Sequence, residues 1–127
     1  MMYTFKKEER LCNKKLIDGL FHSGSSFLCY PYKVSWMLID GGTVPAQVVF
    51  GVPKKRYKHA VDRNLIKRRT REAYRLHKQQ FLYDYLTAND KHLVLSLIYV
   101  GTEIAEYVFI EKKMLKLFGM LTEALAK

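Results

Sequence analysis

The spacing of apolar residues predicts a chain in which helices and strands alternate. Residues 14–22 place their apolar side chains on one helical stripe, at Leu16, Ile17, Leu20 and Phe21. Asn13 is a suitable N-cap for this helix, and Gly24 is a suitable residue to end it. The first element is therefore predicted to be a short amphipathic helix.

Two strands are predicted after this helix. Residues 32–39 follow Pro31 and end at an Asp-Gly-Gly turn over residues 40–42. Residues 46–52 end before Pro53, whose nitrogen cannot donate a hydrogen bond to a neighbouring strand. The short turn between the two stretches predicts that they pair with each other as a hairpin.

The rest of the chain is predicted to form a helix, a strand and a second helix. The long helix runs from about Arg63 to Tyr85. Residues 92–100 are apolar on both faces, which is typical of a central, covered strand. The last helix covers roughly 106–125, with an inner stripe of Ile110, Met114, Leu117, Leu121 and Leu125.

These elements define the expected fold class. With one further short strand allowed for, their order is α-β-β-(β)-α-β-α. A chain of 127 residues fits one domain, so residues 1–127 are expected to form a single domain. The expected fold is α+β, an α/β sandwich with helices packed on a small sheet.

The positive charge of the chain is concentrated in residues 54–78. Eleven of the 22 Lys and Arg residues and two of the 12 acids lie there, so this stretch carries nine of the ten net positive charges. Such a concentration indicates a surface for a polyanion, and a nucleic acid is the leading candidate. A membrane is a weaker candidate, because the sequence shows no signal peptide, no long amphipathic segment and no apolar stretch long enough to span a bilayer. Cys12 and Cys29 have no metal-ligand spacing and indicate reduced thiols in a cytoplasmic protein.

The long helix is predicted to have two distinct faces. Ile66, Thr70, Ala73, Tyr74, His77 and Phe81 fall on the side expected to pack on the sheet. A mere solvated face would normally mix acids with its cations, yet Glu72 is the only acid in residues 63–78 and lies off the cationic arc. That arc, about 140° wide, holds Arg63, Asn64, Lys67, Arg68, Arg71, Arg75 and Lys78. We interpret the arc as a polyanion site.

Other candidate chemistry is sparse in this sequence. The four histidines have no metal-ligand spacing, and His77 is expected to pack rather than to catalyse. Asp62 and Glu72 are ten residues apart along the helix, which argues against a two-carboxylate metal site. Glu72 is expected to pair with Arg68 or Arg75 and to orient it. No nucleophile–base pattern is visible, so no catalytic residue is expected in the protein.

Residues 60–72, AVDRNLIKRRTRE, resemble the signature of the bacterial ribonuclease P protein component, Ala-Val-x-Arg-Asn-x-x-Lys-Arg-x-x-Arg-Glu. In that family the signature follows a strand that ends in a pair of lysines, which correspond here to Lys54 and Lys55. Length, basicity and element order agree along nearly the whole chain. The resemblance implies an α/β sandwich like the second domain of ribosomal protein S5, with a left-handed β-α-β crossover. It also implies the small subunit of a ribonucleoprotein that removes the 5′ leader from precursor tRNA.

In this family the RNA subunit is the catalyst and uses Mg²⁺. The expected partners are therefore the catalytic RNA subunit and precursor tRNA, with no membrane and no protein partner required. Arginine forks suit phosphate, a lysine is a point charge, and Asn64 can both donate and accept. The residues expected to bind RNA are Lys54, Lys55, Arg63, Asn64, Lys67, Arg68, Arg71 and Arg75.

The resemblance also implies a cleft for the leader, between the first helix and the sheet, at Ile17, Phe21, Lys33 and Ser35. Ile17 and Ser35 stand where aromatic residues are expected, which leaves Phe21 to stack on a leader base, a contact worth about 1–3 kcal/mol. The alternative for Phe21 is an ordinary core residue. The alternative for the whole chain is a structural RNA-binding module such as a small ribosomal protein. A helix-turn-helix DNA binder is less consistent, because no pair of short helices precedes the basic helix.

Overall fold

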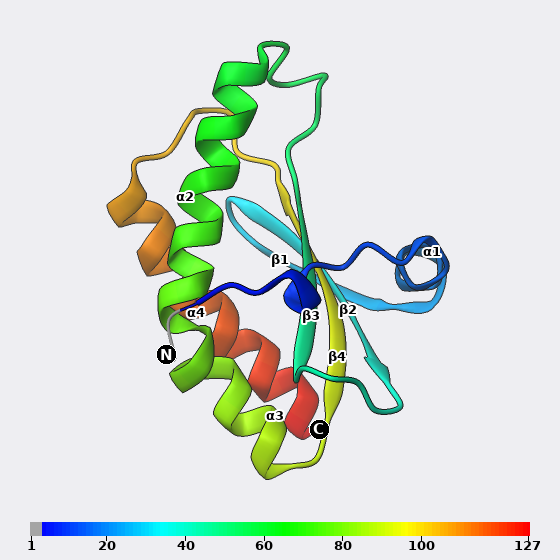
Figure 1. Cartoon of the computed structure of the whole chain (residues 1–127). Helices are drawn as coiled ribbons and strands as arrows, with labels where there is room; N and C mark the ends of the chain where they lie inside the picture. Colours follow the sequence, from blue (N-terminus) through cyan, green and yellow to red (C-terminus); the bar gives the residue numbers. More distant parts are fainter. Residues whose placement is uncertain (1–3) are drawn as a thin grey trace.

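In the computed structural model, residues 4–127 are described, and a four-stranded sheet separates one short helix from a layer of longer helices (Figure 1). The short element η1 is a 3-10 helix, and η2 is a π-helical turn that joins α2 to α3. In chain order the elements are η1 (Lys7–Glu9), α1 (Lys14–Ser23), β1 (Ser25–Cys29), β2 (Tyr32–Ile39), β3 (Ala46–Gly51), α2 (Ala60–Lys78), η2 (Gln79–Tyr83), α3 (Asp84–Ala88), β4 (His92–Tyr99) and α4 (Tyr107–Ala126).

The first helix begins and ends where the sequence predicts. Asn13 caps α1, because its side-chain oxygen accepts a hydrogen bond from the Leu16 N–H at 3.2 Å. Gly24 ends the helix in an extended conformation, not in the left-handed one. A glycine is nevertheless required there, since a Cβ would lie 2.4 Å from the Leu20 carbonyl oxygen.

The other predicted helices are confirmed with shifted boundaries. The long helix begins at Ala60 and continues through η2 and α3 to Ala88, a few residues beyond the expected range at both ends. The inner stripe of α4, from Ile110 to Leu125, is buried as predicted. No helix in residues 4–127 combines the length and the apolar character needed to cross a membrane.

The predicted hairpin of 32–39 with 46–52 is wrong. The sheet order is β1-β2-β4-β3, so β4 lies between β2 and β3. β2 pairs antiparallel with β1 and β4, and β3 pairs parallel with β4. The further short strand allowed for is β1, and it forms the hairpin with β2. β4 takes a central place because its side chains are buried on both faces, whereas a direct β2–β3 pair would leave it at an edge.

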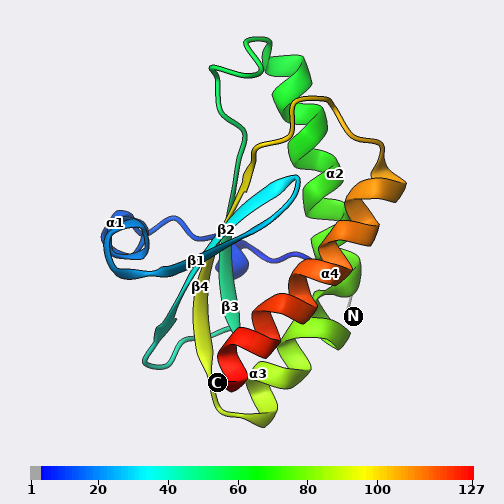
Figure 2. The ribbon, with the colours of Figure 1, turned by 180° about the vertical axis from the view of Figure 1, so that it is seen from behind.

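The connection from β3 to β4 is a left-handed crossover. α2 and α4 lie on one face of the sheet and α1 on the other (Figures 1 and 2). With the helices in front and the strands upright, β4 lies to the left of β3. Most parallel crossovers have the opposite hand, so this is a rare topology, and the resemblance predicted it.

The two faces of the sheet are buried to different extents. The main core lies between the sheet and the α2–α4 layer, around Tyr74 and Phe118. A much smaller cluster, Leu11, Leu20 and Val94, holds α1 against the opposite face. We call this second side the α1 face. Lys33 on this face stays exposed, because the short helix α1 covers only part of the sheet.

Candidate nucleic-acid interface

The long basic helix separates into two faces as predicted. Ile66, Thr70, Ala73 and Tyr74 are buried toward the sheet. The opposite side exposes Asn64, Lys67, Arg68 and Arg71, and we call these four residues the cationic face. Neither an acid nor an apolar group interrupts them along this side of the helix. The face therefore presents closely spaced donors and positive charge to solvent.

For two residues the predicted burial is wrong: Lys78 was expected to be exposed and Phe81 to be buried. Lys78 is only 2% exposed, and its ammonium contacts the Glu9 carboxylate, so it does not belong to the cationic face. Phe81 was expected to be packed but is 39% exposed. It lies in the π-helical turn η2, where an extra residue per turn rotates the following side chains away from their α-helical positions.

Arg75 is held by an acid on the same helix. Its Nη2 and Nε atoms donate to the two Glu72 carboxylate oxygens at 2.5 and 3.1 Å. The hydrogen bond from Arg75 keeps the pKa of Glu72 below its ordinary value. The predicted pairing of Glu72 with Arg75 is confirmed, and the charge of this arginine is partly compensated before any ligand binds.

Lys54 and Lys55 are exposed at the start of a tight loop after β3. The N–H groups of Arg56 and Tyr57 both donate to the Pro53 carbonyl at 3.2 Å. Arg63 closes the loop onto α2, because its Nη1 donates at 2.8 Å to the carbonyls of both Tyr57 and Lys58. Arg63 thus positions the loop that carries the two lysines, a role the sequence did not reveal.

Tyr57 and Arg69 fix this region to the segment between β4 and α4. The Tyr57 hydroxyl donates to the Gly101 carbonyl at 2.8 Å. The Arg69 Nη1 donates to the Ala105 carbonyl at 2.5 Å, which joins α2 to the segment before α4. The cationic face is therefore built on a helix that is held at several points.

The four residues expected to line the leader cleft lie on α1 and on the α1 face of β2. Lys33 is exposed, Ile17 is half-buried, and Phe21 is 56% exposed. Ser35 is on the same side but only 7% exposed. The exposure of Phe21 contradicts its alternative interpretation as a core residue.

Ser35 belongs to a row of serines that crosses the sheet. Strand register places Ser26 opposite Ser35, and Ser35 opposite Ser96. The Ser96 hydroxyl is buried and has no hydrogen-bond partner among residues 4–127. This row of small side chains provides no aromatic ring, so stacking on this side depends on Phe21.

Comparisons with known proteins identify the family of the chain. Residues 5–121 match the family model for Ribonuclease P. The chain is 33% identical, over 115 residues, to the ribonuclease P protein component of Porphyromonas gingivalis strain W83, covering 90% of this chain and 83% of that protein. The chain belongs to the ribonuclease P protein family. It is also 36% identical, over 110 residues, to the ribonuclease P protein component of Chlorobium phaeobacteroides, covering 77% of this chain and 73% of the relative.

Solved structures of ribonuclease P proteins share the fold. The Thermotoga maritima protein superposes with a TM-score of 0.68 at 22% identity, over 87% of this chain and 94% of that one. The Staphylococcus aureus protein superposes with a TM-score of 0.66 at 20% identity, over 91% and 96% of the two chains. The expected α/β sandwich is therefore confirmed as the ribonuclease P protein fold.

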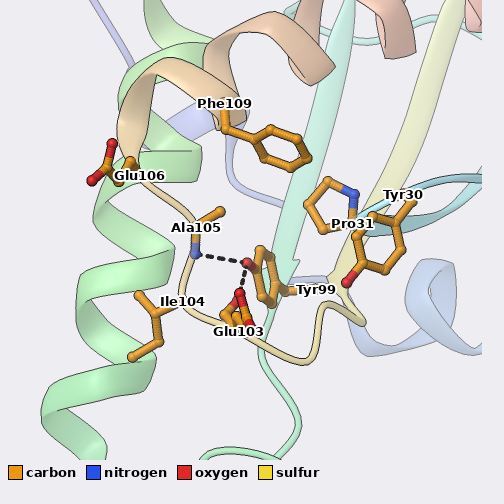
Figure 3. A pocket seen from close by; sticks show the side chains of 8 residues that line it. All are labelled: Tyr30, Pro31, Tyr99, Glu103, Ile104, Ala105, Glu106 and Phe109. Atoms are coloured by element: carbon orange, nitrogen blue, oxygen red, sulfur yellow. Dashed lines mark hydrogen bonds between the residues drawn. The ribbon is translucent and has the colours of Figure 1, made fainter.

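A pocket beside α4 is lined by aromatic and acidic residues, unlike the cationic face. About 330 Å³ in volume, it lies beside the start of α4, where Tyr30 faces it from the turn between β1 and β2 and Phe109 faces it from α4 (Figure 3). The Tyr99 hydroxyl shapes its wall by donating to the Glu103 carbonyl at 2.6 Å and accepting from the Ala105 N–H at 3.1 Å. The side chains of Glu103 and Glu106 also line it, so it is poorly suited to a phosphate backbone.

The histidines and acids of this ribonuclease P family member are dispersed. Across residues 4–127, no group of three His, Cys, Asp or Glu side chains is placed to hold a metal ion. His77 is half-buried, with its Nε2 at 2.8 Å from the Glu111 carboxylate on α4, in agreement with a packing role.

Proposed function

We propose that this chain is the protein subunit of the ribonucleoprotein enzyme ribonuclease P and assists the removal of the 5′ leader from precursor tRNA. One observation carries the proposal most strongly: the cationic face of α2 displays exposed cations and an amide, free of acids, in a member of this family. Its relatives are named ribonuclease P protein components. The enzyme is an endoribonuclease only as the complete particle.

The catalytic RNA subunit is the proposed partner of the basic region. Lys54, Lys55, Lys67, Arg68 and Arg71 are exposed and suited to phosphates, and Asn64 to a ribose, a base edge or a metal-bound water. Arg63 and Arg75 are already engaged with the protein, so they act partly by positioning and partly through charge. Neutralising phosphates in this way releases counterions, which drives binding.

Precursor tRNA is the proposed partner of the α1 face. Its 5′ leader would lie along Ile17, Phe21, Lys33 and Ser35, with Lys33 near a phosphate and Phe21 against a base. Of the serine row, only Ser26 is exposed enough to offer its hydroxyl to the leader, and the row has no ring for stacking. Leader recognition here therefore depends less on stacking than it would with aromatic residues at Ile17 and Ser35.

The RNA subunit is proposed to hold the Mg²⁺ ions and to perform the cleavage. Bound Mg²⁺ supplies charge stabilisation and an activated water for phosphodiester hydrolysis. The protein contributes cations that replace part of the ion atmosphere between two polyanions. Asn64, at the N-terminal end of the cationic face, is proposed to order RNA near those ions.

Reconstitution tests the proposed function. A labelled precursor tRNA is incubated with a bacterial catalytic RNA at limiting Mg²⁺, with and without the protein, and 5′ leader release is measured. The protein should lower the Mg²⁺ needed for cleavage and should cleave nothing by itself. Absence of stimulation at every Mg²⁺ concentration would refute the proposal. RNA binding without stimulation would favour a structural module, although family membership does not favour a ribosomal protein.

We propose a cytoplasmic location and one functional domain over residues 1–127, consistent with the family match over most of the chain.

A further inference from the structure

A pocket of about 230 Å³ opens at the outer edge of β3, between the N-terminal segment and α2. Among residues 4–127, the backbone of the N-terminal segment pairs with this edge strand at one point, where Arg10 bridges to Val48 and the Leu11 N–H donates to the Val48 carbonyl at 2.9 Å. The chain then leaves the strand to enter α1. The pocket lies where the segment departs, so its walls come from three separate elements.

The floor of the pocket is apolar and backed by the core. Phe5 and Phe50 line it, with their ring centroids 5.9 Å apart. Both rings also pack on Tyr74, which is fully buried. A flat group resting on this floor would meet aromatic side chains that are fixed by the main core.

Two arginines stand at the rim of the pocket. Arg71 belongs to the cationic face of α2, and Arg10 comes from the segment before α1. Both side chains are exposed, and neither guanidinium has an ion-pair partner within residues 4–127. The described lining contains no acid. The rim therefore favours an anion and the floor favours a flat apolar group.

We propose that this pocket binds a single nucleotide unit of RNA, with the phosphate held by Arg10 and Arg71 and the base resting on the Phe5–Phe50 floor. The inference rests on the proposed function and adds a contact residue, Arg10, outside the basic helix. Arginine forks match phosphate oxygens, and bases stack on aromatic rings with little regard to sequence. The volume is below the roughly 300–1,000 Å³ of pockets for drug-sized ligands, which suits one unit of a longer chain.

The pocket lies between the cationic face and the α1 face. Arg71 connects it to the cationic face, whereas Cys12 and Val49, which also line it, lie beside the α1 face. A strand that crosses the β3 edge here would link the two surfaces. The nucleotide comes either from the leader or from the catalytic RNA, since both have the same chemistry.

The first experiment measures affinity for Arg10 variants. Arg10→Ala should weaken binding roughly five- to tenfold, either of the protein to the catalytic RNA or of the holoenzyme to precursor tRNA. Arg10→Lys should recover only part of the loss, because lysine keeps the charge without the fork. Lys112→Ala, which removes an exposed charge from α4, is the matched control and should change affinity less than twofold. If Arg10→Ala lowers the affinity for precursor tRNA but not for mature tRNA, the bound nucleotide belongs to the leader. If it lowers the affinity for the catalytic RNA, the nucleotide belongs to that subunit.

The second experiment uses a thiol already present in the pocket. Cys12 is exposed, whereas Cys29 is buried and burial raises the pKa of its thiol, so a photoreactive label attaches selectively to Cys12. Cross-links from Cys12 should map to one short stretch of RNA and should decrease with Arg10→Ala.

Unchanged affinity of Arg10→Ala together with no Cys12 cross-link would overturn this inference. The proposed function would survive that result if wild-type protein still stimulated leader cleavage. Failure of the wild-type protein to stimulate cleavage would instead remove the proposed function.

Discussion

The ammonium of Lys78, on the last turn of α2, is buried against the carboxylate of Glu9, which lies 69 residues earlier in the chain. The Tyr83 hydroxyl donates to the same carboxylate oxygen at 2.5 Å. The Lys78 Nζ also lies over the rings of Phe5 and Tyr83, 5.3 and 5.1 Å from their centroids. This ion pair fastens the N-terminal segment to the helix that carries the cationic face.

We expect each half of this ion pair to depend on the other. Glu9→Leu leaves a buried ammonium without its carboxylate, and Lys78→Met leaves a buried carboxylate without its ammonium. Each single variant should lose about 3–5 kcal/mol in free energy of unfolding, whereas the double variant should be close to wild type or more stable. Urea unfolding of the four proteins measures this cycle. Additive losses in the double variant would show that the two charges do not act as a pair.

The same carboxylate should make the protein sensitive to acid. Burial raises the pKa of Glu9, but hydrogen bonds from the Lys6 N–H, Lys78 and Tyr83 outweigh it, so the pKa is lowered overall. A carboxyl with a depressed folded-state pKa contributes stability that is present above its unfolded pKa, about 4.5, and is lost as pH falls through the lower folded value. Unfolding free energy measured from pH 6 to pH 3 should therefore fall more in wild type than in the Glu9→Leu, Lys78→Met double variant. Parallel curves would contradict the prediction.

Local sequence patterns predicted the helices and the cationic face, because periodicity and capping depend on neighbouring residues. The strand order could not be predicted in the same way. The turn at residues 40–42 suggested a hairpin, but the position of β4 is decided by burial on both of its faces, which is a property of the assembled sheet. The left-handed crossover followed from family resemblance and not from general rules.

Two features of the site were also beyond sequence reasoning. Lys78 continues the spacing of the cationic arc, but its ammonium is buried and compensated by Glu9, an acid 69 residues earlier in the chain. Arg10 stands in an ordinary charged segment, and only the fold brings it beside Arg71. Contacts between segments that are distant along the chain have no periodic signal.

The cationic face should dominate the salt dependence of RNA binding. Replacing Lys67 and Arg71 together by alanine should reduce the slope of log affinity against log salt by roughly one to two units, because fewer counterions are released. The matched control replaces Lys112 and Lys116, two exposed lysines of α4, and should leave the slope unchanged. Titrations of the catalytic RNA at several salt concentrations measure both. Equal slope changes in the two double variants would indicate a diffuse charge effect instead of a binding face.

Arg63 should act on RNA binding through the loop that it holds. Arg63→Ala removes the donors to the Tyr57 and Lys58 carbonyls, so the backbone around Lys54 and Lys55 should exchange its amide hydrogens faster. Lys67→Ala removes a charge of the same helix without touching the loop and should leave that exchange unchanged. RNA affinity should therefore fall more for Arg63→Ala than for Lys67→Ala. If amide hydrogen exchange in the loop were unaltered in Arg63→Ala, Arg63 would act on RNA binding only by direct contact.

Substitution of Phe21 should weaken binding of the leader without lowering the stability of the fold. Because its side chain is 56% exposed, Phe21→Ala should leave the free energy of unfolding nearly unchanged. Holoenzyme affinity for precursor tRNA should fall by about 1–3 kcal/mol if a leader base stacks on the ring, while affinity for mature tRNA, which has no leader, should stay constant. The neighbouring Leu20 is buried under α1, so Leu20→Ala provides the opposite control, with a stability loss of about 2–5 kcal/mol. Equal losses of affinity for both tRNAs in Phe21→Ala would show that the ring supports the fold of α1 and not the leader.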